Sequence, residues 1–193
     1  MSGGLFVTLD AASIARLGNQ IGAAGAKAPL ALARALNHTG DKAKTQMTRA
    51  LTAQTGLKRR TIVKALRITK AGTVGLTYTI RSAGGDISLK YFGARETAKG
   101  VSAAPRNARA IYPHTFMKAG WWPHRVVKAN WNGHVLERTG STTKSGMDRF
   151  QKVKSGVFIP EEMVKGATAA AFNNTAASDL PARLEHELGR ILG

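Results

Sequence analysis

The sequence of 193 residues contains no cysteine, and acidic residues are scarce in it. Without a thiol the chain cannot form a disulfide framework, a thiolate zinc site, an iron–sulfur cluster or a cysteine nucleophile. An apolar run of the roughly 20 residues needed to cross a bilayer is also missing. The first segment, MSGGLFVTLD, lacks the basic start of a signal peptide. We therefore expect a soluble protein that stays inside a cell or a particle and has no membrane partner.

Positive charge is what the chain has in excess. It carries 29 Lys and Arg against 11 Asp and Glu, which gives a formal net charge of +18. Hydrophobic residues make up 43% of the chain, a share typical of globular domains, so disorder of the whole chain is not expected. The length suits a single domain over residues 1–193.

Sequence patterns that carry catalysis are missing. There is no G-x-S-x-G, no G-x-x-x-x-G-K-[ST] and no strand-linked G-x-G-x-x-G. His114, His124 and His134 are evenly spaced, but the spacing fits no compact metal motif. The few carboxylates lie in predicted turns and helix starts, where capping explains them, although carboxylates distant in sequence can still meet in a fold. We predict no catalytic residue, no metal site and no cofactor.

Residues 10–68 are predicted to form an N-terminal helical region. Asp10 is a suitable N-cap for a first helix. After Pro29, apolar residues at intervals of four and seven predict a long amphipathic helix, disturbed at Gly40 and ended near Gly56. Its apolar face comprises Leu32, Leu36, Ala43, Met47 and Leu51. A short basic helix is expected in the segment LKRRTIVKALRI that follows.

Residues 72–159 are predicted to form a sheet region. Alternating apolar residues at 74–80 and 87–91, with Gly84 and Gly85 between them, predict a hairpin. Further strands are expected at 111–119, 125–129, 134–138 and 157–159. The polar segments 93–110 and 140–156 lack apolar periodicity and are expected to be long loops, the first of them mobile in the isolated protein.

Residues 160–193 are predicted to form a C-terminal helix. Pro160 and two acids in the first turn suit a helix start, and a break is expected near 178–181. The fold class is therefore α+β: a mostly antiparallel sheet flanked by long N-terminal and C-terminal helices, with two long polar loops.

The cations are concentrated in one block. Between Asp41 and Asp86 there is no acidic residue, while ten Lys and Arg lie at 42–81. Such a block can neutralise phosphates without reading sequence, can be a solvated helix face, or can contact an acidic partner. Signatures of base-reading modules are missing. The rings of Trp121, Trp122 and Trp131 could stack on bases, but bulky rings more often pack in a core or a subunit interface.

The order of these features is informative. The segment ALNHTGDKAKTQMTRAL leads into LKRRTIVKALRI and then strands, and YPHTFMKAG, NGHVLERTG and VFIPEEM come later. From about residue 10 to its end the chain resembles the minor tail protein Z family of long-tailed phages, also called tail completion proteins. The matching positions are Ala35–Thr39, Arg49, Lys58–Lys64, Phe116, Gly133, Val135, Arg138, Ile159 and Pro160.

The resemblance implies a nonenzymatic structural subunit of a phage or prophage tail. Family members act at the head-proximal end of the tail tube, the neck, where they make the tail competent for head joining. It implies self-association in a ring, for which a hexamer is one candidate, beside a tail terminator, the tail tube proteins and a head–tail connector. The expected location is the virion neck, and the host cytoplasm during assembly.

Candidate contact residues follow from combining the charge with the resemblance. We expect the basic block to face an acidic ring surface or the DNA in the channel, together with cations of the 93–110 segment. The candidates are Lys58, Arg59, Arg60, Lys64, Arg67, Arg95, Lys99, Arg106 and Arg109. The alternative is a nonspecific nucleic-acid-binding protein that uses the block 42–81, and an enzyme such as a nuclease is a third and weaker reading.

Overall fold

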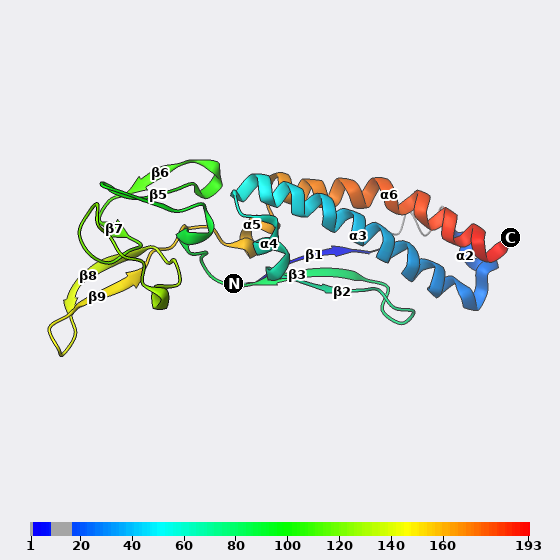
Figure 1. The fold of residues 1–193 in the computed structure, drawn as a ribbon. Coiled ribbons are helices and arrows are strands. Elements are labelled where there is room, and N and C mark those ends of the chain that lie inside the picture. Colours follow the sequence, from blue (N-terminus) through cyan, green and yellow to red (C-terminus); the bar gives the residue numbers. More distant parts are fainter. Residues whose placement is uncertain (1, 9–16) are drawn as a thin grey trace.

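A computed structural model describes residues 2–8 and 17–193 of the chain. The molecule is elongated, with two long helices side by side along most of its length and a group of short strands at one end (Figure 1). The described residues are α+β, as the sequence predicts. They form three separate three-stranded antiparallel sheets where one sheet was expected.

The long helix α3 (Ala28–Thr55) confirms the strongest sequence prediction. The five apolar residues predicted for its buried face are all buried. It ends at Gly56, which adopts the left-handed conformation with φ 75°. Gly40 does not disturb the helix: a Cβ there would lie 2.4 Å from the ring of Tyr78, so glycine lets a strand pack close to α3. The shorter α2 (Gly18–Ala24) and the turn η1 (Gly25–Lys27) precede it, whereas Asp10 lies outside the described residues.

The C-terminal region consists of α5 (Ile159–Met163) and α6 (Gly166–Leu192). The predicted break near 178–181 is wrong, because Pro181 lies inside α6 and the chain breaks earlier, between the two helices. The carbonyl left without a donor by Pro181 is that of Ala177, an exposed residue that water can reach. Helix α6 runs antiparallel to α3 and buries Phe172 and Leu184 against it (Figure 1).

The first sheet has the order β1 (Ser2–Val7), β3 (Tyr78–Ala83) and β2 (Leu66–Thr69). Strand β1 was not expected from the sequence, and the predicted hairpin over 74–91 is wrong. Instead, the backbone N–H of Ile87 donates to the carbonyl oxygen of the distant Val157, with an N···O distance of 3.0 Å. The turn η2 (Leu89–Tyr91) follows. Helices α3 and α5 pack on this sheet, and a Cβ on Gly3 would lie 2.3 Å from the carbonyl oxygen of Pro160.

The segment 93–110 is not the polar loop predicted for it. It contains β4 (Arg95–Thr97), β5 (Gly100–Ala103) and the turn η3 (Pro105–Asn107), and β5 pairs with β6 (Ala110–Tyr112). Val101 and Ala103 are fully buried. These side chains are few and small, so the segment shows no apolar periodicity although part of it lies in the core.

The third sheet has the order β7 (Thr115–Phe116), β8 (Leu136–Thr142) and β9 (Asp148–Lys152). Strands β8 and β9 occupy much of 140–156, which was expected to be a loop. The predicted strand 125–129 is reduced to one bridge between Ala119 and Val126 before the turn η4 (Ala129–Trp131), and 157–159 leads into α5 without forming a strand. A turn at Asn132 and Gly133, with φ 47° and 64°, leads towards β8.

Candidate basic interface

Five of the candidate contact residues lie on consecutive elements. Lys58 precedes the short helix α4 (Arg59–Ala65), which carries Arg59, Arg60 and Lys64, and Arg67 follows in β2. All five are exposed, and within the described residues none of them forms a salt bridge. The helix is fixed from below by Ile62, which is fully buried. The structure therefore places these five cations at exposed positions on two consecutive elements.

Arg67 lies directly opposite Arg81 of β3 in the antiparallel pair. Both are exposed, on the face of the sheet opposite to the buried Tyr78 and Ile80. Like charges directly opposite each other destabilise a sheet, and none of the three strands contains an acidic residue that could separate them. This face therefore has an electrostatic cost that an external anion would relieve.

A hollow of about 320 Å³ opens beside α4. We call it the α4 hollow. It is lined by Arg60, Thr61, Lys64, Ile87, Tyr91 and Ile159. Arg60 and Lys64 are one helical turn apart, so both reach the same side of α4. The site combines two cations with an apolar floor and an exposed aromatic ring, Tyr91.

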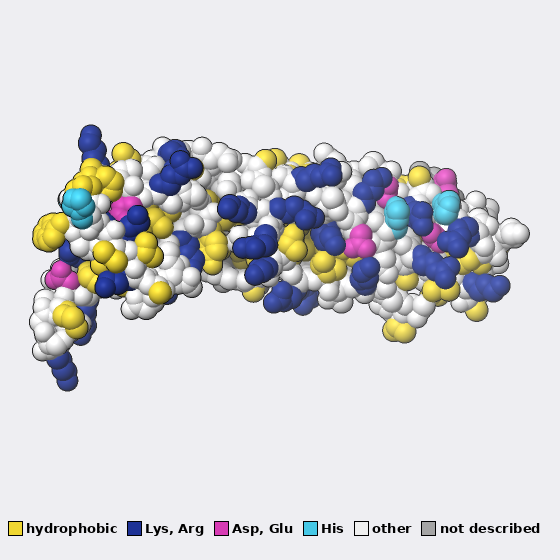
Figure 2. All heavy atoms as spheres, viewed as in Figure 1, with side chains coloured by type: hydrophobic (Ala, Val, Ile, Leu, Met, Phe, Trp, Pro, Cys, Tyr) yellow, Lys and Arg dark blue, Asp and Glu magenta, His cyan; other side chains and the backbone are white. Residues whose placement is uncertain are grey.

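The acidic residues of the chain are used internally. In the described ranges, every acidic side chain except those of Glu161 and Glu185 accepts a hydrogen bond from another residue of the chain or forms an ion pair with one. Lys and Arg side chains extend along the whole visible face, on which acidic side chains are few (Figure 2). The exposed cations of α4 and β2 form no ion pair with any acidic residue in the described part of the chain.

Asp41 illustrates this internal use. Its Oδ1 accepts from the Tyr78 hydroxyl at 2.8 Å, and its Oδ2 lies 3.1 Å from Lys70 Nζ. Burial would raise the pKa of Asp41, but these bonds and the charge of Lys44 outweigh it, so the pKa is lowered. The pKa of Tyr78 is raised by burial and by the carboxylate. The hydrogen bond between Asp41 and Tyr78 ties α3 to β3.

The other four candidate contact residues lie in the second sheet and next to it. Arg95 and Lys99 are exposed, and Arg109 donates to Ser102 Oγ at 3.1 Å. Arg106 differs from the prediction, because its guanidinium is bound to a buried carboxylate, that of Glu162. It holds the fold together, while the remaining three are at the end of the molecule away from α2 (Figure 1).

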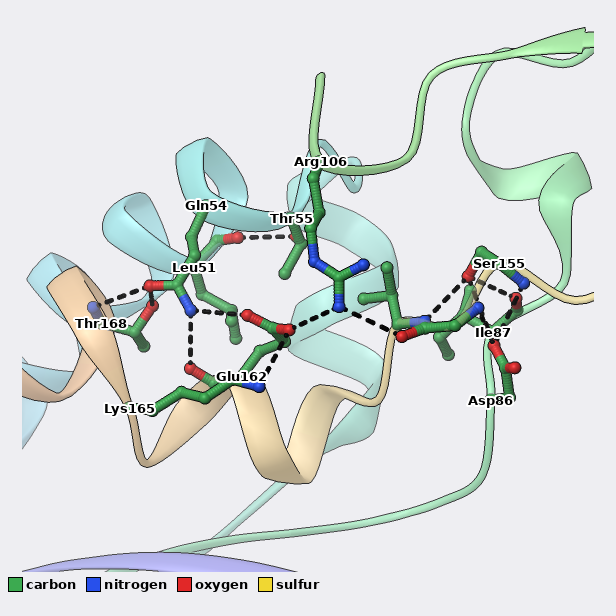
Figure 3. Close-up of polar contacts among 12 residues, drawn as sticks. Leu51, Gln54, Thr55, Asp86, Ile87, Arg106, Ser155, Glu162, Lys165 and Thr168 are labelled. Atoms are coloured by element: carbon green, nitrogen blue, oxygen red, sulfur yellow. Dashed lines mark hydrogen bonds and ion pairs between the residues drawn. The ribbon is translucent and has the colours of Figure 1, made fainter. Parts of the chain in front are cut away.

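Glu162 is the centre of what we call the junction network (Figure 3). Its Oε2 accepts from Gln54 Nε2 at 2.7 Å, and its Oε1 accepts from Arg106 Nη2 at 3.0 Å and lies 3.4 Å from Lys165 Nζ. Gln54 Oε1 in turn accepts from Thr168 Oγ1 at 2.9 Å. Burial would raise the pKa of Glu162, but the bonds from Gln54 and Arg106 and the charge of Lys165 lower it overall. The network joins α3, η3 and the α5–α6 break.

Sequence reasoning assigned Glu162 only to the first turn of a helix, because acids favour that position. No local signal pairs it with Gln54 or Arg106, which are far away in the chain. The three evenly spaced histidines do not converge either. In the described ranges no group of three or more His, Asp or Glu residues is placed to hold a metal ion.

The three tryptophans differ in how far they are packed, and Trp131 is partly buried. Trp131 packs edge to face with Phe116 and Phe150, with ring centroids 5.7 and 5.8 Å away. Trp121 is 87% exposed and Trp122 49% exposed. Packing thus accounts for Trp131, as expected, but not for the other two.

Comparison with protein-family models, with curated proteins and with solved structures finds no match to this chain. Among the described residues, no helix has the length and apolar character required to cross a membrane.

Proposed function

We propose that this chain is a nonenzymatic structural subunit of a long-tailed phage or prophage tail that acts in tail completion at the neck. The observation that carries the proposal is the cation cluster of α4 and β2, which is exposed and forms no ion pair with the described part of the chain. A surface of this kind suits an external anionic partner, as a subunit of an assembly around DNA would have. The resemblance described above supplies the assembly.

The matching residues support the proposal through their positions. Ala35 and Leu36 are fully buried on the face of α3 that packs in the core, and Ile159 is buried where α5 begins. Phe116 lies beneath the guanidinium of Arg138, with the guanidinium carbon 5.5 Å from the ring centroid. The residues that carry the resemblance thus include several that build the fold.

We further propose that copies of the chain associate in a ring, with a hexamer as one candidate, beside the tail terminator, the tail tube proteins and the head–tail connector. An elongated subunit with two different ends suits a heterologous contact, and such a contact closes into a ring when its rotation permits. In this proposal the chain is located in the host cytoplasm during assembly and in the neck of the finished virion.

The experiment is co-expression of the chain with the proteins encoded beside it, followed by light scattering and negative-stain imaging. The proposal expects rings, alone or on the end of tail tubes. It expects Arg59→Glu/Arg60→Glu to prevent attachment, and Arg34→Glu/Lys144→Glu, which changes the net charge equally, to leave it intact. A chain that stays monomeric and never joins a tail tube would refute the proposal.

A second candidate function is nonspecific nucleic-acid binding through the block 42–81. The pair formed by Arg67 and Arg81 favours it, because a phosphate between two opposed guanidinium groups removes their repulsion. Salt dependence distinguishes the two functions. A nucleic-acid binder loses affinity log-linearly with salt concentration, with a slope of about 0.9 per phosphate contacted, whereas a ring subunit has weak intrinsic affinity for DNA.

A further inference from the structure

The α4 hollow is built from three segments that are distant in sequence. Helix α4 forms one wall with Arg60 and Lys64, the segment 87–91 forms another, and Ile159 at the start of α5 closes the floor. Its volume of about 320 Å³ is at the small end of the range of about 300–1,000 Å³ that is usual for ligand sites. It can receive one or two side chains of a partner but not a whole helix.

The walls are fixed before any ligand arrives. The Asp86 carboxylate accepts from the N–H of Ser155 at 3.1 Å and of Gly156 at 2.9 Å (Figure 3). Ile87 is held between two backbone hydrogen bonds, to Val157 at 3.0 Å and from Ser155 at 2.9 Å. A preformed site loses little conformational freedom on binding, which favours affinity.

The chemistry of the lining is mixed. Arg60 and Lys64 stand at the rim without an ion-pair partner among the described residues, and Lys90 Nζ lies 5.2 Å from the ring centroid of Tyr91. The apolar part of the lining consists of the half-buried Ile87, the buried Ile159 and the exposed Tyr91 ring. A ligand that pairs with the two cations and also covers the apolar side chains must carry negative charge beside an apolar group.

We propose that the α4 hollow binds an acidic segment of a partner protein, with an apolar or aromatic side chain of that segment inserted between its carboxylates. The segment's carboxylates meet Arg60 and Lys64, and its apolar side chain covers Ile87 and Tyr91. The backbone of a nucleic acid supplies the charge but no apolar group for the floor, and it suits the flat face at Arg67 and Arg81 better. This site does not depend on the proposed tail function.

The test is fluorescence anisotropy with the full chain and three labelled probes. One is a short peptide of glutamates around a Leu-Trp pair, the second replaces that pair by two serines, and the third is a single-stranded oligonucleotide of equal charge. The Leu-Trp peptide is expected to bind most tightly. Arg60→Glu/Lys64→Glu should weaken its binding about tenfold or more, since two ion pairs become repulsive.

Two controls make the test specific. Arg34→Glu/Lys144→Glu changes the net charge by the same amount at exposed positions on α3 and at the β8–β9 turn, and should leave peptide binding within about twofold of the parent. Tyr91→Ser should weaken the Leu-Trp peptide about three- to tenfold and leave the serine peptide unchanged. Because Tyr91 is 43% exposed, the variant is expected to fold, and its thermal melt verifies this.

Three results overturn the proposal. One is equal affinity for the Leu-Trp and serine peptides, which would show that the apolar residues of the hollow do not contribute to binding. Another is equal weakening by the two double charge reversals, which reduces binding to net charge. The third is oligonucleotide binding that is tighter than peptide binding and is lost in Arg60→Glu/Lys64→Glu, which makes the hollow a phosphate surface. Failure to form rings would refute the tail function without affecting any of these measurements.

Discussion

Replacing Glu162 by alanine removes the carboxylate at which α3, η3 and the α5–α6 break meet. The side chain is 5% exposed. Its bond from Gln54 is a charge-assisted hydrogen bond in a buried setting, worth about 1.5–3 kcal/mol. The side chain of Arg106 is 49% exposed and that of Lys165 is 53% exposed, so solvent screening reduces each ion pair to about 0.2–1 kcal/mol.

The expected loss in the free energy of unfolding is therefore about 3 kcal/mol. For a chain of this size each kcal/mol lowers Tm by about 2–4 °C, so Tm should fall by about 6–12 °C. Differential scanning calorimetry at neutral pH measures this. Glu161→Ala is the matched control, because the neighbouring residue makes no side-chain hydrogen bond within the described residues and should cost less than about 1 kcal/mol.

The pH dependence provides an independent check. The folded-state pKa of Glu162 is lowered from 4.5, so its stabilisation is complete above the unfolded-state pKa and is lost as the pH falls through the folded-state pKa. In Glu162→Gln this part of the acid dependence should disappear, leaving a shallower fall in Tm between neutral pH and the acid range. An effect of Glu162→Ala no larger than that of Glu161→Ala, or an unchanged acid dependence in Glu162→Gln, would refute the junction network as a source of stability.

Two further predictions concern the first sheet. Gly40→Ala should destabilise the fold by about 1–3 kcal/mol, because the added methyl meets the Tyr78 ring. Gly84→Ala, where a Cβ meets open space, is its control in thermal melts, and equal Tm values would contradict the close packing of α3 on β3. Arg81→Thr should raise the free energy of unfolding by about 0.2–1 kcal/mol by relieving its repulsion with Arg67, and should also reduce the salt slope of oligonucleotide binding. A loss of stability would show that the opposed arginines do not repel in the folded protein.

The sequence could predict only part of the candidate site. The cations of α4 and β2 are adjacent in the chain, so their clustering follows from composition and a short helix. The α4 hollow could not be predicted, because Tyr91 and Ile159 reach it from distant segments. In sequence, Arg106 could not be distinguished from the other candidate cations. The structure distinguishes it, because its Nη2 donates to Glu162 Oε1 at 3.0 Å.

By itself the sequence determined the long helix α3, its end at Gly56, the start of α5 and the position of the basic block. These features depend on side-chain spacing within a few turns and on the backbone preferences of glycine and proline, which are local. Tertiary structure decided the partners of β3, the division into three sheets and the junction network. Each of these depends on backbone or side-chain hydrogen bonds between residues far apart in the chain, and local spacing contains no information about such pairs.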